Sequence, residues 1–390
     1  MFKGLKHTVQ AGLMALMAAG TAAALAGGVT DREIVLGTHL DLSGPVAAGM
    51  PNIRNGMQMR LDEANEGAGV NGRKFRLVVE DNGSQPQMAV RATDKLVRQD
   101  DVFAIINPFG SGTNAAVAKR AVDAGVIYFA PWGASSIIRK SAADSPLLFT
   151  VTPNYDTIMN TGVKWMLENQ GAKKVGYIYQ EGPLGTLVGE GVKKALAAKG
   201  MSYAAEAGYK AGDIDFSSQV ARMKAADVDL IVIATITRET VGIMAEVKKL
   251  GWTNVKVLTA NPGRTGIVAA LGKDTVEGLY GVGTWKLYTN DNAPAPVKTW
   301  FAAYKRKFNS DPDENALLAY SYTDMFVKSV QAAGRDVTAD KVVKYLQANS
   351  FEGPLFYAKQ NFKGNHLDPE YVEVDQIKGG AWTPLTKPMQ

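Results

Sequence analysis

The feature that most constrains the fold is an alternation of short apolar runs with amphipathic segments, which continues from Ile34 to about Leu279. Buried strands account for the apolar runs, and helices for the segments with apolar residues three or four apart, such as Ile53, Met57 and Leu61. Strand–helix repetition predicts an α/β fold with parallel sheets covered by helices on both faces. The expected strands are 34–40, 75–80, 102–106, 126–130, 147–151, 174–179, 202–207, 230–234 and 255–259. The expected helices are 52–65, a helix that begins at Pro86, 114–124, 155–169, 185–199, 215–226 and 238–250.

The alternation starts again at about residue 147, which indicates two α/β units rather than one. After Leu279 the pattern changes. Three helices, expected at about 297–308, 316–333 and 339–348, follow one another, and two short strands are expected near 354–357 and 371–376. Counting strands and helices does not assign this tail to the first or to the second unit.

The N-terminus has the composition of a secretory signal peptide. Lys3, Lys6 and His7 precede an alanine-rich apolar stretch, and Ala24-Leu25-Ala26 fits the small-x-small cleavage pattern. A membrane anchor is the alternative, but the apolar stretch is shorter than the roughly 20 residues that a spanning helix needs. We therefore expect cleavage after Ala26, which removes two lysines and takes the formal charge from +5 to +3.

The chain contains no cysteine. It therefore has no disulfides, and no cysteine at the cleavage site to carry a lipid. We expect a monomer that is released as a soluble protein into an oxidising compartment, most simply the bacterial periplasm.

Few residues are suited to catalysis. Beyond residue 26 the only histidines are His39 and His366, which lie far apart in the sequence, so neither a zinc site nor thiol catalysis is expected. The nucleophile-elbow and phosphate-loop motifs do not occur, and no run of basic residues indicates nucleic-acid binding. We expect no cofactor and no enzymatic activity.

The segment 110–115, Gly-Ser-Gly-Thr-Asn-Ala, is similar to the dinucleotide-binding fingerprint. Its strand is not the first of its unit, Asn107-Pro108-Phe109 intervenes, and the next strand ends at Phe129-Ala130-Pro131 without an acid for a ribose. A dehydrogenase is therefore disfavoured. A helix N-terminus with Ser111, Gly112 and Thr113 suits a solute carboxylate instead, because its N–H groups are free; plain capping of the helix is the alternative.

Several short motifs, in order along the chain, resemble the type I periplasmic binding proteins of branched-chain amino acid ABC transporters, the leucine/isoleucine/valine-binding family. The resemblance covers essentially all of 34–385. The motifs are Leu42-Ser43-Gly44-Pro45, Asn71-Gly72-Arg73-Lys74, Glu80-Asp81-Asn82 with Pro86, Ile106–Thr113, Gly125-Val126 through Ala130-Pro131, Asp215-Phe216-Ser217 and Glu277-Gly278-Leu279.

This resemblance implies two Rossmann-like lobes joined by three crossovers, with a ligand cleft between them. Lobe one would be 31–153 plus 284–352, and lobe two 154–283 plus 353–390. The implied function is the solute-binding component of an ABC importer, which closes over its solute by a hinge motion and is recognised by a membrane permease. A ligand-sensing domain of the same fold is the alternative.

The resemblance also implies binding residues. The solute carboxylate would be held by Ser111, with Gly112 and Thr113, and by the turn Trp132-Gly133-Ala134-Ser135. Amino-acid binders commonly have a threonine where this chain has Ala134, and Leu184 stands where they have a tyrosine.

The acid that holds the ligand's ammonium group in the family is expected in the loop Ala260–Arg264, but that loop contains no acid and one arginine. We therefore hypothesise that Arg264 and Arg238 pair with carboxylate oxygens, and that the solute is an organic acid without an α-amino group, such as an aromatic carboxylate. For each arginine the alternative is a solvated residue at a helix end. A branched-chain amino acid or an amide is the alternative solute.

Overall fold

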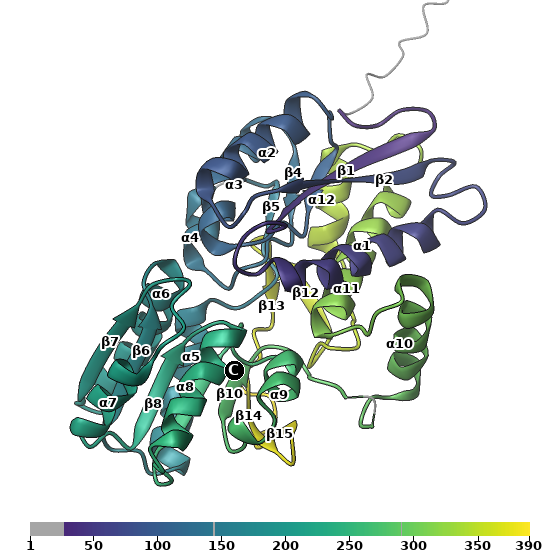
Figure 1. Cartoon of the computed structure of the whole chain (residues 1–390). Coiled ribbons are helices and arrows are strands. Elements are labelled where there is room, and N and C mark those ends of the chain that lie inside the picture. The colour runs from purple at the N-terminus through teal and green to yellow at the C-terminus, as the bar shows by residue number, and fades with distance from the viewer. Residues whose placement is uncertain (1–26, 143–144, 290) are drawn as a thin grey trace, which may run out of the picture.

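The computed structural model describes residues 27–142, 145–289 and 291–390, and the predicted signal peptide (1–26) lies outside them. The chain forms two α/β lobes, each built around its own sheet (Figure 1). In the described ranges no helix is both long and apolar enough to cross a lipid bilayer.

The first lobe is built on a parallel five-stranded sheet in the order β2-β1-β3-β4-β5. Successive residues of β1 point to opposite faces, so Ile34 and Leu36 join one core cluster and Val35 joins another. The strands are β1 (Glu33–Leu40), β2 (Lys74–Asp81), β3 (Ala104–Ile106), β4 (Ile127–Phe129) and β5 (Leu148–Phe149). The helices between them are α1 (Met50–Ala64), α2 (Pro86–Arg98), α3 (Ser111–Asp123) and α4 (Ser136–Ser141).

The second lobe is built on a seven-stranded sheet in the order β15-β14-β10-β9-β8-β6-β7. Its interior strand β8 is buried on both faces, because Leu230 and Val232 pack into one cluster and Ile231 and Ile233 into another. The strands from the main chain run are β6 (Val175–Gln180), β7 (Ala205–Tyr209), β8 (Leu230–Ala234), β9 (Lys256–Ala260) and β10 (Tyr280–Gly283). The helices are α5 (Tyr155–Asn169), α6 (Pro183–Ala197), α7 (Ser217–Ala225), α8 (Thr237–Lys249) and α9 (Gly266–Gly272). This confirms the predicted α/β class with two lobes.

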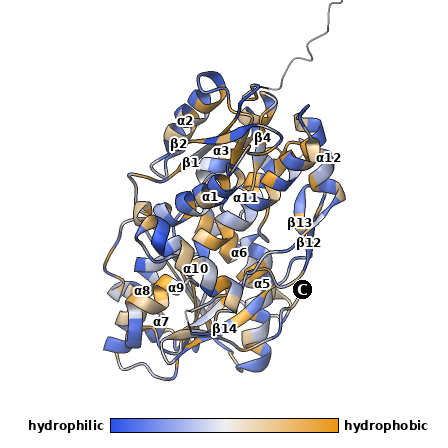
Figure 2. Ribbon diagram, turned by 90° about the vertical axis from the view of Figure 1, so that its right-hand side faces the viewer, coloured by the Kyte–Doolittle hydropathy of each residue, from blue (hydrophilic) through white to orange (hydrophobic). Residues whose placement is uncertain are grey.

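The tail first returns to the first lobe. The helices α10 (Ala295–Phe308), α11 (Glu314–Ala333) and α12 (Ala339–Ala348) lie on its side of the molecule, and Phe326 of α11 belongs to its core (Figure 1). The helices α1 and α11 are in close contact: a Cβ atom at Gly56 would lie 2.1 Å from the carbonyl oxygen of Ala316. Figure 2 shows α1 and α12 carrying hydrophilic and hydrophobic residues in turn, as expected of helices that pack on one side only.

The end of the chain differs from the prediction. The prediction of a strand near 354–357 is wrong, because that segment forms turns. A small antiparallel sheet was not expected; its strands are β11 (Ser350–Phe351), β12 (Gln360–Lys363) and β13 (His366–Asp368). Phe362 of this sheet packs in the core of the first lobe. The last two strands, β14 (Glu373–Lys378) and β15 (Ala381–Pro384), extend the second sheet.

The chain therefore passes between the lobes three times: after β5, after β10 and before β14. The exact lobe boundaries named above stay a prediction, but the packing of Phe362 indicates that the third crossing lies after 352.

Candidate functional site

The lobes enclose a cavity of about 700 Å³, a volume within the usual range for small-molecule sites. Its lining comes from loops and helix starts of both lobes and from α11. Most of the wall is apolar or aromatic, with Phe109, Trp132, Tyr155, Leu184, Trp285 and Tyr322 among its members.

One end of the cavity is the N-terminus of α3. The helix begins at Ser111, three residues before the predicted start, and Ser111, Gly112 and Thr113 all line the cavity. The residue before the helix is Gly110, with φ of 104°, and a Cβ atom there would lie 2.4 Å from Thr113 Oγ1. Only glycine fits this position, so the entry into α3 depends on it.

Three carbonyl groups near this end accept hydrogen bonds from buried side-chain amides. The Asn114 amide donates to the carbonyl oxygens of Pro108 (3.0 Å) and Trp132 (2.9 Å). Asn82 donates to the carbonyl oxygen of Phe109 (2.9 Å). The first N–H groups of α3 have no partner within the helix, so this end of the cavity offers donors and suits an anionic group.

A chain of hydrogen bonds holds Asn82 and Asn114. Asn82 Nδ2 donates to His39 Nδ1 (2.9 Å), which leaves His39 Nε2 to donate to the Tyr128 hydroxyl (2.9 Å), and Tyr128 donates to Asn114 Oδ1 (2.7 Å). Burial lowers the pKa of His39 to about 3, so the imidazole stays neutral. His39 is therefore a structural residue behind the cleft and does not face the solute.

The turn after β4 lies against the start of α3. Gly133 has φ of 135°, and a Cβ atom there would lie 2.7 Å from Ser111 Oγ, so glycine allows this close approach. Trp132 donates from Nε1 to Asn107 Oδ1 (3.0 Å) and meets Tyr322 edge-on. Trp132, Gly133 and Ala134 line the cavity, whereas Ser135 is buried outside the lining.

The second lobe contributes a wall from α6, α8 and the loop after β9. Leu184 lines the cavity near the start of α6, and Ile236 lines it just before α8. Glu239, in the first turn of α8, also lines the cavity although it is only 1% exposed. Its Oε1 accepts from Arg238 (3.1 Å), while its Oε2 is buried and has no hydrogen-bond partner among the described residues.

Sequence reasoning overlooked Glu239, because the acid was sought only in the loop Ala260–Arg264. One signal was available: Glu239 lies in the first turn of the helix that follows the parallel strand β8, and the carboxyl ends of parallel strands face the crevice of such folds.

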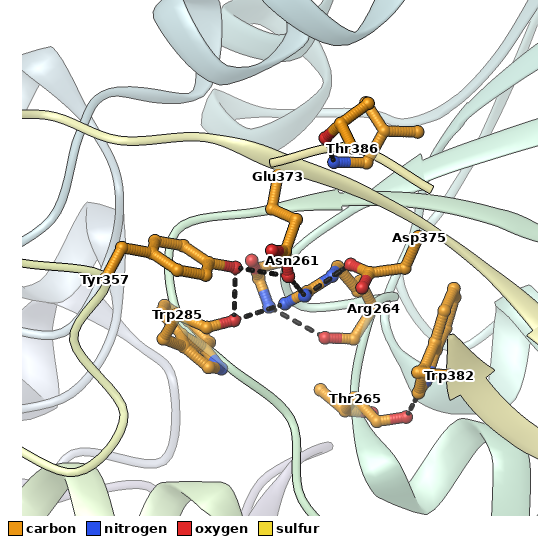
Figure 3. Close-up of polar contacts among 10 residues, drawn as sticks. Asn261, Arg264, Thr265, Trp285, Tyr357, Glu373, Asp375, Trp382 and Thr386 are labelled. Carbon is orange, nitrogen blue, oxygen red and sulfur yellow. Dashed lines mark hydrogen bonds and ion pairs between the residues drawn. The ribbon is translucent and has the colours of Figure 1, made fainter. Parts of the chain in front are cut away.

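Neither of the two proposed arginines lines the cavity. The Arg238 side chain is 58% exposed. Arg264 is fully buried: its guanidinium pairs with Asp375 and donates from Nη1 to the carbonyl oxygen of Trp285 at 2.9 Å (Figure 3). The hypothesis that Arg264 meets a solute carboxylate does not fit this structure, because a carboxylate of the chain itself already holds the guanidinium. Among the described residues that line the cavity the charged ones are Glu181 and Glu239, so the expected positive charge is not there.

The cleft lies between two lobes, has a helix N-terminus at one end and has mostly apolar walls. These features are typical of a protein that encloses a small solute. Comparison with known families agrees: the family model described as Periplasmic binding protein matches residues 33–375. The chain therefore belongs to the periplasmic binding proteins, and within them to the group that includes the Leu/Ile/Val-binding proteins, as the sequence resemblance predicted.

Two curated relatives show how far the sequences in this group have diverged from this chain. The Leucine-, isoleucine-, valine-, threonine-, and alanine-binding protein of Pseudomonas aeruginosa is 27% identical over 346 residues, which cover 88% of this chain and 90% of the relative. The Leu/Ile/Val-binding protein BraC3 of Rhizobium johnstonii is 24% identical over 317 residues, covering 81% and 83% respectively.

Solved structures share the fold. A solute-binding protein of an ABC transporter from R. palustris, in complex with benzoate, has a TM-score of 0.80 at 19% identity and covers 92% of this chain and 97% of its own. The branched-chain amino acid transporter substrate-binding protein from Streptococcus pneumoniae, in complex with isoleucine, has a TM-score of 0.77 at 22% identity and covers 90% and 98%.

Proposed function

We propose that this chain is exported to the periplasm and captures a small carboxylic acid with an apolar body, aromatic or aliphatic, for delivery to the permease of an ABC importer. One observation carries the proposal: the free N–H end of α3, with Ser111, opens into a cavity whose walls are mostly apolar and aromatic. The carboxylate would lie at Ser111 and the body between Trp132 and Leu184.

Relatives of the same fold support this class of solute. One binds benzoate, another is in complex with 3,4-dihydroxy benzoic acid, and a third binds isoleucine. All three solutes carry a carboxylate and an apolar or aromatic body.

Glu239 favours a second candidate, a solute that also carries an ammonium or amide nitrogen. Its unpartnered Oε2 and the unpartnered Oδ1 of Asn261 are buried acceptors in residues that line the cavity from the second lobe. A buried acceptor left without a donor is costly, and an N–H group of the solute would remove that cost. An apolar amino acid or amide meets this requirement.

A thermal-shift screen tests the proposal. The panel comprises leucine, phenylalanine, their de-aminated analogues 4-methylpentanoate and 3-phenylpropanoate, and benzoate, with glucose as a control that has no carboxylate. A true solute at 100 times its Kd is expected to stabilise the protein by about 2.7 kcal/mol. Small-angle scattering should show a smaller radius of gyration with that compound, because closure brings the lobes together. Stabilisation without compaction would exclude hinge closure, and stabilisation by glucose alone would exclude a carboxylate solute.

Replacing Ser111 with alanine is expected to weaken binding of the compound selected by the screen by about tenfold to a hundredfold. The reason is the loss of a hydrogen bond to a charged group, which is worth roughly 1.5–3 kcal/mol. Isothermal titration calorimetry measures the change. Ser217→Ala is the matched control, because Ser217 is likewise the first residue of a helix but is exposed and away from the cavity. If the Ser111 variant and the parent bind the compound with equal affinity, Ser111 does not contact the solute and has only a structural role.

A further inference from the structure

A buried cluster of polar residues lies where the chain crosses between the lobes (Figure 3). Arg264 follows β9, Glu373 and Asp375 lie on β14, Trp285 follows β10, and Tyr357 comes from the tail segment between β11 and β12. The cluster thus joins the second sheet to two of the three connections between the lobes.

The cluster holds the main chain of a residue that lines the cleft. The carbonyl oxygen of Trp285 accepts from Arg264 Nη1 (2.9 Å) and from the Tyr357 hydroxyl (2.8 Å), while Trp285 itself contributes to the cavity lining. The position of the Trp285 indole in the cleft wall therefore depends on these two donors.

The Tyr357 hydroxyl has two acceptors but only one hydrogen to donate. Besides the carbonyl oxygen of Trp285, it lies 3.1 Å from Glu373 Oε1. If Glu373 is ionised, its carboxylate competes with Trp285 for that hydrogen. If Glu373 is protonated, the carboxyl O–H can donate to the Tyr357 oxygen, and the Tyr357 hydroxyl is then free to donate to Trp285.

The charges of the cluster allow Glu373 to change its protonation near neutral pH. Asp375 holds the single guanidinium of Arg264, and Arg264 Nη2 lies 3.9 Å from Glu373. Burial, followed by the charge of Asp375, raises the pKa of Glu373 to about 7, and Arg264 and Lys286 oppose this rise. The other titratable groups facing Glu373 are Tyr357 and Tyr288; burial raises the pKa of each, so both stay protonated in this range.

We propose that Glu373 is a positioning residue for the cleft: through Tyr357 it determines whether one or two donors hold Trp285 in the wall beside the solute. The protonated form gives Trp285 two donors, and the ionised form leaves it with Arg264 alone. The geometry of the site therefore changes with pH. The proposal does not depend on which solute binds.

The test uses the mature, ligand-free protein with ¹⁵N-labelled tryptophan. The indole resonance of Trp285, assigned with a Trp285→Phe variant, is followed from pH 5.5 to 8.5. In the parent it should move with a midpoint near 7. In Glu373→Gln the side chain has an amide in place of the titratable carboxyl group, so the resonance should not move with pH over this range. In Tyr357→Phe the second donor is missing, so it should stay near its high-pH position.

Two controls separate Glu373 from other groups. The Trp252 indole lies in a different core cluster and should not follow the transition. Glu314 is the matched carboxyl: burial also raises its pKa to about 7, but it accepts from the Gly266 N–H and has no hydrogen bond to Tyr357 or Trp285. Glu314→Gln should therefore titrate like the parent. The proposal is overturned if the parent shows no transition, or if the transition persists in Glu373→Gln.

Discussion

Replacing Arg264 with methionine is expected to lower the free energy of unfolding by about 3–5 kcal/mol, because removing one partner of a buried ion pair leaves the other charge uncompensated. Arg264 is fully buried, and its partner Asp375 is 1% exposed. Denaturant unfolding at pH 7.5 measures the loss. Arg238→Met is the matched control: its side chain is 58% exposed, so a change within about 0.5 kcal/mol is expected.

Adding Asp375→Asn to the Arg264 variant should recover part of the loss, because the double variant no longer buries the carboxylate charge. A loss below about 1 kcal/mol in the single variant would contradict this account of the pair. If Arg264 met the solute instead, as the sequence suggested, Arg264→Met would change affinity while stability stayed the same. The two roles are thus distinguished by one variant.

Glu239→Gln is expected to reduce the preference of the cleft for an α-amino acid over its de-aminated analogue by about tenfold or more. The carboxylate of Glu239 would pair with an ammonium group, and a hydrogen bond between charged groups is worth roughly 1.5–3 kcal/mol. Calorimetry with phenylalanine and 3-phenylpropanoate, and with leucine and 4-methylpentanoate, gives the ratio of affinities within each pair.

Glu181→Gln controls for the general charge of the cavity, because Glu181 also lines it but is exposed, whereas Glu239 is buried. An equal fall in the ratio in both variants would indicate long-range electrostatics rather than contact. An unchanged ratio in Glu239→Gln would remove the reason for the second candidate, and a de-aminated acid would remain as the proposed solute.

Most of the fold could be predicted because its main signal is local. The helices 155–169 and 339–348 and the strand 230–234 have the predicted bounds. The failure near 354–357 and the unexpected sheet after it have one cause: β12 and β13 are short strands with many polar residues, including Gln360, Asn361 and His366. They are held by the packing of Phe362 on a distant core, which periodicity does not reveal.

The site was predictable where it is built by segments that directly follow strands of the first sheet. Ser111 to Thr113 and Trp132 to Ala134 follow strands that end at the same sheet edge, and the structure places all of them in the cavity lining. The predicted role of Arg264 was wrong because its partner Asp375 lies 111 positions further along the chain, on the tail strand β14, which pairs with β10. Glu239 was missed because the acid was expected in the loop Ala260–Arg264, whereas Glu239 lies in the first turn of a different helix, α8.

The main-chain N–H groups at the start of α3 have a consequence for how such a protein can diverge. The donors at the start of α3 belong to the main chain, so a point mutation can change the side chain there without deleting them. The wall from the second lobe is different, since Leu184 at the start of α6 and Ile236 and Glu239 at the start of α8 would act through their side chains. Substitutions in the second lobe, selected in nature or introduced to make a sensor for a new acid, can therefore change which solute body fits the cleft. The main-chain donors of α3 would still bind the carboxylate.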